Sequence, residues 1–290
     1  YVVFTPYKKK WMSHLQPEED FKAYDIAPYL DKFKTLSTKL KIVHELSDID
    51  FSPSTIPAPT IRLNNSIIDH YEDTRNFPSV PGTSQLGTSL RFGTVCIRQL
   101  ARKAYQSANH TFLSELIWRE FFQQILWHFP KTVNYSFKPA YDRIEWRNAS
   151  EDFERWKEGK TGYALVDAGM RELNATGYMH NRVRMLVASF LCKHLLIDWR
   201  LGEAYFAEKL FDFELASNVG NWQWAAGSGV DAAPYFRIFN PITQAKKFDA
   251  DLKYIRKWVP EFDTDDYPDK MVDHKEARAR CLDVYKEAVS

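Results

Sequence analysis

The stretch from Phe211 to Phe239, FDFELASNVGNWQWAAGSGVDAAPYFRIF, is the part of the chain that decides how the rest is read. Trp222 and Trp224 lie two residues apart, and Gly220 and Gly227 flank them. A glycine inside a helix costs about 1 kcal/mol, so a helix that only packs would avoid it. Large rings beside small residues suit a site that another flat ring approaches closely. An aromatic corner of the core with a glycine loop explains this composition equally well.

The whole chain has the composition of a folded protein with a large core. It contains 290 residues, of which 44% are hydrophobic and 15% aromatic, enough for one large domain or two small ones. The net charge is only +1, so a nucleic-acid surface would have to be a local basic patch. Three cysteines without metal-ligand spacing favour a reducing compartment. No apolar run predicts a membrane span or a signal peptide.

Helical periodicity begins near Thr83 and continues along the chain. Apolar residues at 113, 117, 121, 125 and 129 predict a helix over 111–129. The same pattern predicts helices over 163–174, 181–199, 202–211 and 273–288, with a break at Gly177. A short helix is expected within 28–46 and an irregular, proline-rich connection over 48–69. We therefore expect a linker over 1–20 and one mainly α-helical domain over 21–290. The lysines at 8–10 favour a solvated linker over a DNA contact.

Two further places carry residues suited to ligand binding. In PGTSQLG at 81–87, small hydroxyl residues open a helix expected near Ser84, where free N–H groups can bind phosphate; an ordinary helix cap is the alternative. Glu115, Trp118 and Phe122 share one helix face, so a carboxylate and two rings could meet a base. The alternative there is a core tryptophan and an ion pair of Glu115 with Arg119.

Four long motifs resemble the photolyase/cryptochrome family, and the resemblance extends over nearly the whole chain. They are LSELIWREFF at 113–122, EGKTGYALVDAGMRELNATGYMHNRVRM at 158–185, LLIDWR at 195–200 and LFDFELASNVGNWQWAAGSGVDAAPYFRIFNP at 210–241. The class I cyclobutane pyrimidine dimer photolyases are the most similar subgroup. The resemblance implies an all-α FAD-binding domain. The family's N-terminal α/β antenna domain has no counterpart in this sequence, which begins with Tyr1 and is expected to be a fragment.

By this resemblance the chain binds FAD, with no metal and no antenna chromophore. Asn218 would face flavin N5, and Asp212 would pair with Arg184. Two positions depart from the family pattern, because Gly87 replaces a serine and Glu214 commonly is an aspartate. The implied cofactor-binding residues are Tyr71, Thr83, Ser84, Gln85, Leu86, Gly87, Arg119, Asn181, Arg184, Asp212, Phe213, Glu214 and Asn218.

The resemblance also implies a DNA-lesion site and an electron relay. The lesion and DNA residues would be Arg75, Glu115, Trp118, Phe122, Asn181, Arg182, Met185, Trp224, Arg237 and Gln244. The (6-4) photolyases carry histidines at the positions of Asn181 and Met185, so these residues favour cyclobutane dimers. Trp146, Trp199 and Trp222 match the family's relay in order from the surface to the flavin. Together with Glu115 and Asn218 they form the expected catalytic set.

The implied activity is that of a carbon–carbon lyase that repairs cyclobutane pyrimidine dimers in DNA with light. An electron passes from excited reduced FAD to a flipped-out dimer, and damaged bases cost least to unpair. Two alternatives are a cryptochrome-type blue-light photoreceptor without repair activity and a DNA-binding helical fragment without FAD. We expect a monomer in the bacterial cytosol, with the nucleus as the alternative. Its partner would be dimer-containing DNA, and it would normally be linked to an antenna domain.

Overall fold

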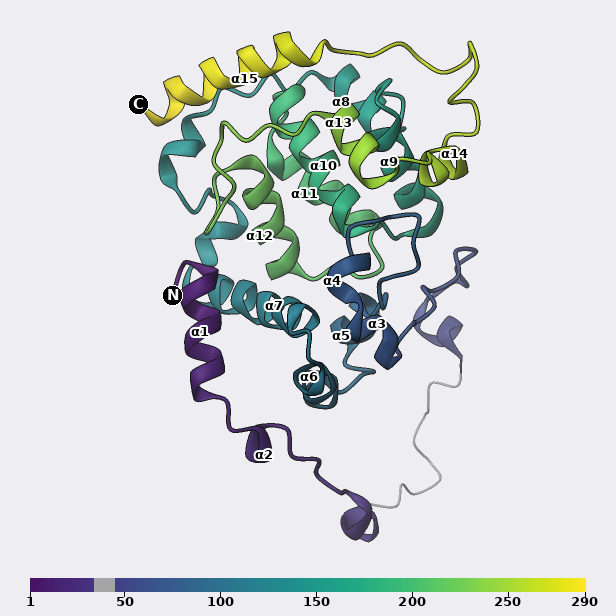
Figure 1. The fold of residues 1–290 in the computed structure, drawn as a ribbon, viewed down its shortest axis with the longest axis vertical. Helices are drawn as coiled ribbons and strands as arrows, with labels where there is room; N and C mark the ends of the chain where they lie inside the picture. Colours follow the sequence, from purple (N-terminus) through teal and green to yellow (C-terminus); the bar gives the residue numbers. More distant parts are fainter. Residues whose placement is uncertain (34–44) are drawn as a thin grey trace.

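The computed structural model describes residues 1–33 and 45–290, and within these ranges every regular element is helical (Figure 1). The all-α prediction is confirmed. The α-helices are α1 Phe4–His14, α2 Pro17–Asp20, α3 Asn65–Asp69, α4 Tyr71–Thr74, α5 Gly87–Phe92, α6 Ile97–Gln106, α7 Thr111–His128, α8 Ser150–Lys157, α9 Ala164–Thr176, α10 Asn181–Ser189, α11 Trp199–Lys209, α12 Leu215–Ala226, α13 Pro241–Phe248, α14 Lys253–Trp258 and α15 His274–Val289. Short turns are η1 Ala27–Lys32, η2 Leu46–Ile49, η3 Pro130–Val133, η4 Pro139–Arg143 and the π-helical η5 Phe190–His194.

The long periodic helices lie close to where the sequence predicts them. The helix expected over 111–129 is α7, and those expected over 163–174 and 273–288 are α9 and α15. Gly177 ends α9 with φ at 65°, a conformation that suits glycine. The segment 181–199 is shorter than expected as an α-helix, because α10 passes into the π-helical turn η5. The helix expected over 202–211 starts earlier, at Trp199, where the Asp198 side chain caps it.

The N-terminal segment differs from the linker expected over 1–20. It contains α1, which lies beside α7 (Figure 1). Phe4, Tyr7 and Trp11 follow the i, i+3, i+7 spacing of one helix face and pack into the cluster around α7. Three consecutive lysines between these aromatics mask the periodicity in the sequence. Most of the short helix expected over 28–46 lies outside the described residues; the described part is the turn η1. The connection over 48–69 ends in α3.

Two large apolar clusters meet at α12. One surrounds α7 and includes α1 and α6, and the other gathers α8 to α11 and α14 around Trp156, Trp199 and Trp222. The glycine argument against a helix here is wrong, because α12 runs through Gly220. A Cβ at Gly220 would overlap the ring of Phe122 on α7. The glycine therefore allows α7 and α12 to approach closely, which outweighs its low helix propensity.

Candidate functional site

Two adjoining cavities lie where α7, α10 and α12 converge. The outer cavity has a volume of about 410 Å³ and reaches α4, α7 and the segment before α5. The inner cavity has a volume of about 90 Å³ and reaches α11 and the start of α12. The residues that line both cavities are Asn181, Arg184, Met185, Asp212, Ser217, Asn221 and Trp224. These shared walls join the two spaces into one elongated site.

Each residue expected to bind the cofactor lines one or both of these cavities. The outer cavity is lined by Tyr71, Thr83–Gly87 and Arg119, and the inner cavity is lined by Phe213, Glu214 and Asn218. Segments more than a hundred residues apart in the sequence thus form one wall. The helix expected near Ser84 begins only at Gly87 and has six residues. Residues 83–86 therefore face the cavity as an irregular loop, with Gln85 at φ 53°, and precede the first turn of α5.

The charged pair predicted between Arg184 and Asp212 is present and bidentate. Arg184 Nη1 and Nη2 donate to Asp212 Oδ1 and Oδ2 at 3.1 and 2.9 Å. Burial alone would lower the pKa of Arg184, but the carboxylate of Asp212 outweighs it and keeps that pKa above its ordinary value. A Cβ at Gly87 would lie 2.7 Å from Asp212. The glycine that replaces the family's serine thus leaves room for this carboxylate.

Asn218 is held by a residue that the sequence analysis missed. Its Nδ2 donates to the backbone oxygen of Glu203 at 3.0 Å and to Glu203 Oε1 at 2.8 Å. With the amide nitrogen engaged, the carbonyl oxygen is the group that Asn218 can offer to the inner cavity. Burial raises the pKa of Glu203. Glu203 lies on α11, 15 residues before Asn218, so no local spacing in the sequence indicates the contact.

Glu115 forms a different ion pair from the one considered in the sequence. It accepts from Arg75 Nη1 at 2.5 Å, while Arg119 Nη2 turns to the backbone oxygen of Leu90 at 3.4 Å. Both Arg75 and Glu115 line the outer cavity, together with Trp118 and Phe122. Burial and the nearby Glu115 raise the pKa of Tyr71 to about 12. The cavity therefore has a neutral phenol, one ion pair and two rings along α4 and α7.

Positive charge gathers beside the outer cavity. Arg182, at the start of α10, donates to Asn76 at 2.5 Å and lies 4.4 Å over the ring of Phe248. Burial, followed by the neighbouring guanidinium groups of Arg75 and Arg237, lowers the pKa of Arg182. Three arginines thus lie near one another without a neutralising carboxylate for each. Gln244, on α13, is half-buried and does not line either cavity.

The three tryptophans expected to form a relay differ in burial. Trp222 and Trp199 are buried, while Trp146 is half-buried and packs against Tyr285. Trp222 lines the inner cavity, and a Cβ at Gly202 would overlap its ring. Of the three, only Trp222 lies at a cavity wall within the described residues. Trp146, which the resemblance places at the surface end, is the most exposed of the three.

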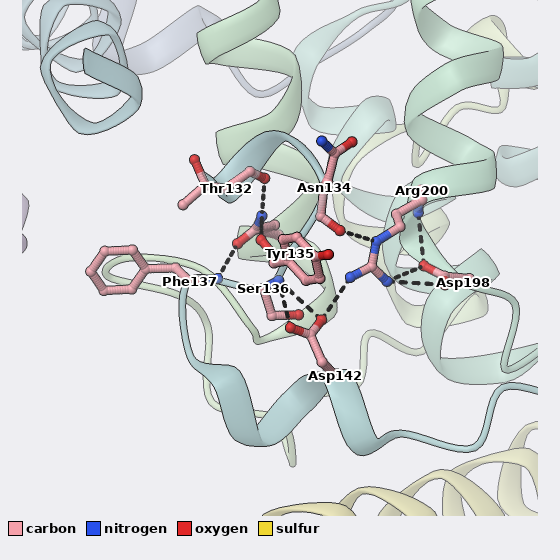
Figure 2. Close-up of polar contacts among 9 residues, drawn as sticks. Thr132, Asn134, Tyr135, Ser136, Phe137, Asp142, Asp198 and Arg200 are labelled. Carbon is pink, nitrogen blue, oxygen red and sulfur yellow. Dashed lines mark hydrogen bonds and ion pairs between the residues drawn. The ribbon is translucent and has the colours of Figure 1, made fainter. Parts of the chain in front are cut away.

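Polar contacts of the residues that follow Trp199 and Trp222 fix α11 and α12 to the segment 132–142 (Figure 2). The buried Gln223, between Trp222 and Trp224, accepts from Phe137 N and donates to the backbone oxygens of Thr132 and Tyr135. Arg200 lies 4.8 Å from the ring of Trp199 and bonds Asp142 and Asp198. Neither Gln223 nor Arg200 was singled out from the sequence. Each has a partner more than 50 residues away along the chain, Asp142 for Arg200 and Phe137 for Gln223.

Comparison with known proteins identifies the family. The family described as "FAD binding domain of DNA photolyase" matches residues 112–265. A deoxyribodipyrimidine photo-lyase of Escherichia coli is 40% identical, with 99% of this chain and 68% of that protein aligned. A similar relative from Halobacterium salinarum is 37% identical over the same shares. No helix in the described ranges is long and apolar enough to cross a membrane.

Solved structures agree with the sequence relatives. A bacterial class III photolyase from Agrobacterium tumefaciens superposes with a TM-score of 0.84 at 34% identity, covering 99% of this chain and 68% of that one. A cryptochrome from Synechocystis gives a TM-score of 0.70 at 32% identity, covering 76% of this chain and 52% of that one. The long motifs, the helical fold and the paired cavities therefore have one explanation: the chain belongs to the photolyase/cryptochrome family and contains the FAD-binding domain of the DNA photolyases.

Proposed function

We propose that the protein is a deoxyribodipyrimidine photo-lyase that binds FAD in the two cavities and repairs cyclobutane pyrimidine dimers. The observation that carries this proposal is the outer cavity, where two carboxylates, two tryptophans and two methionines line a space beside the clustered Arg75, Arg182 and Arg237. FAD joins a flat flavin ring to a negatively charged diphosphate, and the site offers aromatic rings, the narrow position at Gly87 and Arg184. The residues present therefore fit the cofactor.

FAD would supply the light-driven one-electron chemistry when bound. Asn218 would orient its carbonyl oxygen towards the ring nitrogen, held by Glu203. The Asp212–Arg184 pair would place a fixed, oriented ion pair beside the inner cavity. An electron would pass inwards from the surface through Trp146, then Trp199, then Trp222. In this arrangement the protein positions the cofactor and excludes water through the buried faces of α10 and α12.

After leaving the duplex, the lesion would occupy the part of the outer cavity lined by Glu115, Trp118 and Trp224, beside the bound FAD. Trp118 and Trp224 would pack against its two rings, and Glu115 and Asn181 would hydrogen-bond its polar edges. Arg75 would leave Glu115 as DNA binds and move to a phosphate, since phosphate contacts position the strand without reading sequence. No histidine is among the described residues that line the outer cavity, and Asn181 and Met185 stand where (6-4) photolyases have histidine. Cyclobutane dimers are therefore the favoured substrate.

The decisive experiment is light-dependent repair of an oligonucleotide with one defined thymine dimer. Illuminated protein with chemically reduced FAD should restore the undamaged bases, and the dark reaction should not. Glu115→Ala should lower the repair yield and the preference for damaged DNA. Arg182→Ala should weaken binding to damaged and undamaged DNA alike and reduce the salt slope by about one unit. Arg256→Ala is the matched control, because Arg256 is exposed and pairs only with Asp263 at 3.1 Å.

A cryptochrome-type photoreceptor is the second candidate, supported by the likeness to the Synechocystis cryptochrome. It predicts bound FAD that responds to blue light without any repair. If the protein holds FAD, is photoreduced, and leaves the thymine dimer intact under every illumination, the repair proposal fails and the photoreceptor proposal stands. A protein that stays colourless and does not take up added FAD would contradict both.

A further inference from the structure

The first aromatic residue of α1 covers one face of a cavity-lining tryptophan. The rings of Phe4 and Trp118 are stacked with centroids 3.7 Å apart and planes 9° from parallel. Phe121 meets the edge of the same indole at 5.4 Å, with the planes at 88°. Phe4 itself is only 8% exposed. Phe4 on one face and Phe121 at the side therefore set the tilt of Trp118. The part of the indole that these two rings leave uncovered lines the outer cavity.

Phe4 also connects Trp118 to the segment that follows α12. The backbone N–H of Phe4 donates to Asp231 Oδ2 at 3.2 Å. Asp231 follows α12, the helix that carries Trp224, and adopts a positive φ of 45°. Its neighbour Val230 is buried in the same apolar cluster as Phe4. One residue of α1 thus contacts both the helix that bears Trp118 and the segment that ends the helix bearing Trp224.

The rest of α1 is fastened to α7, which fixes the place of Phe4. Tyr7 Oη and Trp11 Nε1 donate to the two carboxylate oxygens of Glu120 at 2.9 and 3.1 Å. Lys8 Nζ donates to Ser114 Oγ at 2.5 Å. Burial, together with Glu120, raises the pKa of Tyr7, so this phenol stays a donor at neutral pH. These contacts lie on successive turns of both helices and hold α1 in one register.

We propose that Phe4 is a positioning residue for the DNA lesion, acting through Trp118. This inference rests on the proposed function, in which Trp118 and Trp224 enclose the flipped-out dimer. The Phe4 ring keeps the indole tilted so that its spacing from Trp224 fits two stacked pyrimidines. Without that ring, the indole can turn into the vacated volume and away from the cavity. Removing the Phe4 ring should therefore lower the affinity for dimer-containing DNA, and binding of undamaged DNA, which depends on the arginines, should not change.

The test compares Phe4→Ala with Phe21→Ala at fixed salt concentration. Phe21 is a fair control, because it is 7% exposed, belongs to the same cluster and packs on Tyr105 at 5.7 Å. Binding is measured with one oligonucleotide that contains a thymine dimer and with its undamaged counterpart. Phe4→Ala should weaken dimer binding roughly 2- to 12-fold, the range expected for a lost aromatic pair, and leave undamaged binding unchanged. Phe21→Ala should change neither. Equal dimer binding by Phe4→Ala and the unmodified protein would overturn the proposal.

A second measurement follows the indole itself and does not depend on repair. The protein is labelled with 5-fluorotryptophan, and the ¹⁹F resonance of Trp118 is assigned from its disappearance in Trp118→Phe. Phe4→Ala should broaden this resonance, because the indole gains room to turn, and Phe4→Leu, which retains most of the apolar volume, should keep it narrower. A resonance as narrow in Phe4→Ala as in the unmodified protein would overturn the positioning role. If the unmodified protein shows no preference for dimer-containing DNA while the resonance of Phe4→Ala broadens, the proposed function fails but the positioning of Trp118 by Phe4 stands.

Discussion

The pair formed by Arg184 and Asp212 offers the most direct test of the cavity, through the substitution Asp212→Asn. The change keeps the size of the side chain and one oxygen, but it places an NH₂ group against a guanidinium N–H. The two side chains are only 23% and 16% exposed, so water cannot fully replace the lost bond. A hydrogen bond to a charged group contributes about 1.5–3 kcal/mol. We therefore expect the free energy of unfolding of the FAD-free protein to fall by about 2–3 kcal/mol.

This magnitude translates into a measurable change in melting temperature. An unfolding entropy of about 2.1 cal/mol/K per residue gives about 0.6 kcal/mol/K for a chain of 290 residues. Asp212→Asn should thus lower Tm by about 3–5 °C without FAD. Because the pair lines both cavities, the variant should also lose part of the stabilisation that added FAD gives. That stabilisation reaches about 2.7 kcal/mol when FAD is present at a hundred times its Kd.

Glu261→Gln is the matched control for this experiment. Arg171 Nη2 and Glu261 Oε1 are 2.6 Å apart, with side chains 22% and 28% exposed, and neither residue lines the cavities. This variant should lose about 1 kcal/mol and keep the full response to FAD. Thermal melts of all three proteins across an FAD titration would measure both effects. If Asp212→Asn and Glu261→Gln lose the same stability and respond equally to FAD, the reasoning about this pair is wrong.

Three further predictions follow from the same site and its core. Trp222→Phe should sharply slow photoreduction of oxidised FAD by an external donor yet preserve repair by chemically reduced FAD; unchanged photoreduction in absorbance traces would remove Trp222 from the relay. Glu203→Ala should slow light-driven FAD reduction as Asn218→Cys does, because the amide loses an acceptor, with FAD content unchanged in both; an effect of only one variant would separate the two residues. Burial, and then nearby positive charge, lowers the pKa of His180 to about 4 and of His194 to about 3, from 6.5. The stability that these two neutral histidines contribute is therefore fully present above pH 6.5 and is lost as the pH falls. The free energy of unfolding should decrease by up to about 2.7 kcal/mol per pH unit near pH 5. Urea titrations at several pH values should show half that slope for His194→Gln.

Several site features could be predicted from the sequence because they belong to single segments. Glu115, Trp118 and Phe122 share a face by helix geometry alone, and the structure has all three on the outer cavity. The motif resemblance also indicated the Asp212–Arg184 pair. The partner of Glu115 could not be predicted this way. Local spacing offers Arg119, but the fold brings Arg75 to 2.5 Å, and a short contact across two helices replaces the i, i+4 pair.

The N-terminal segment and the glycines show where local patterns mislead. The lysines of α1 made a packed helix read as a linker, since the pattern of Phe4 and Tyr7 becomes evident only beside α7. From the sequence, Gly220 predicts a break in the helix. In the structure it lies inside α12, against the ring of Phe122. In both cases the missing information is a contact with another element. The low helix propensity of glycine costs about 1 kcal/mol. Burying one large apolar side chain contributes more than this to the free energy of unfolding.

The sequence by itself determined the helical class, the long helices α7, α9 and α15, and membership of the family, because periodicity and motifs are written along one segment. Only the tertiary structure decided that α1 covers the back of Trp118, that Glu203 orients Asn218, and that Gln223 secures α12 between its two tryptophans. Each of these contacts joins residues at least 15 positions apart. Their energies depend on the distance and angle between elements, which the packing of α7, α11 and α12 sets and no local pattern records.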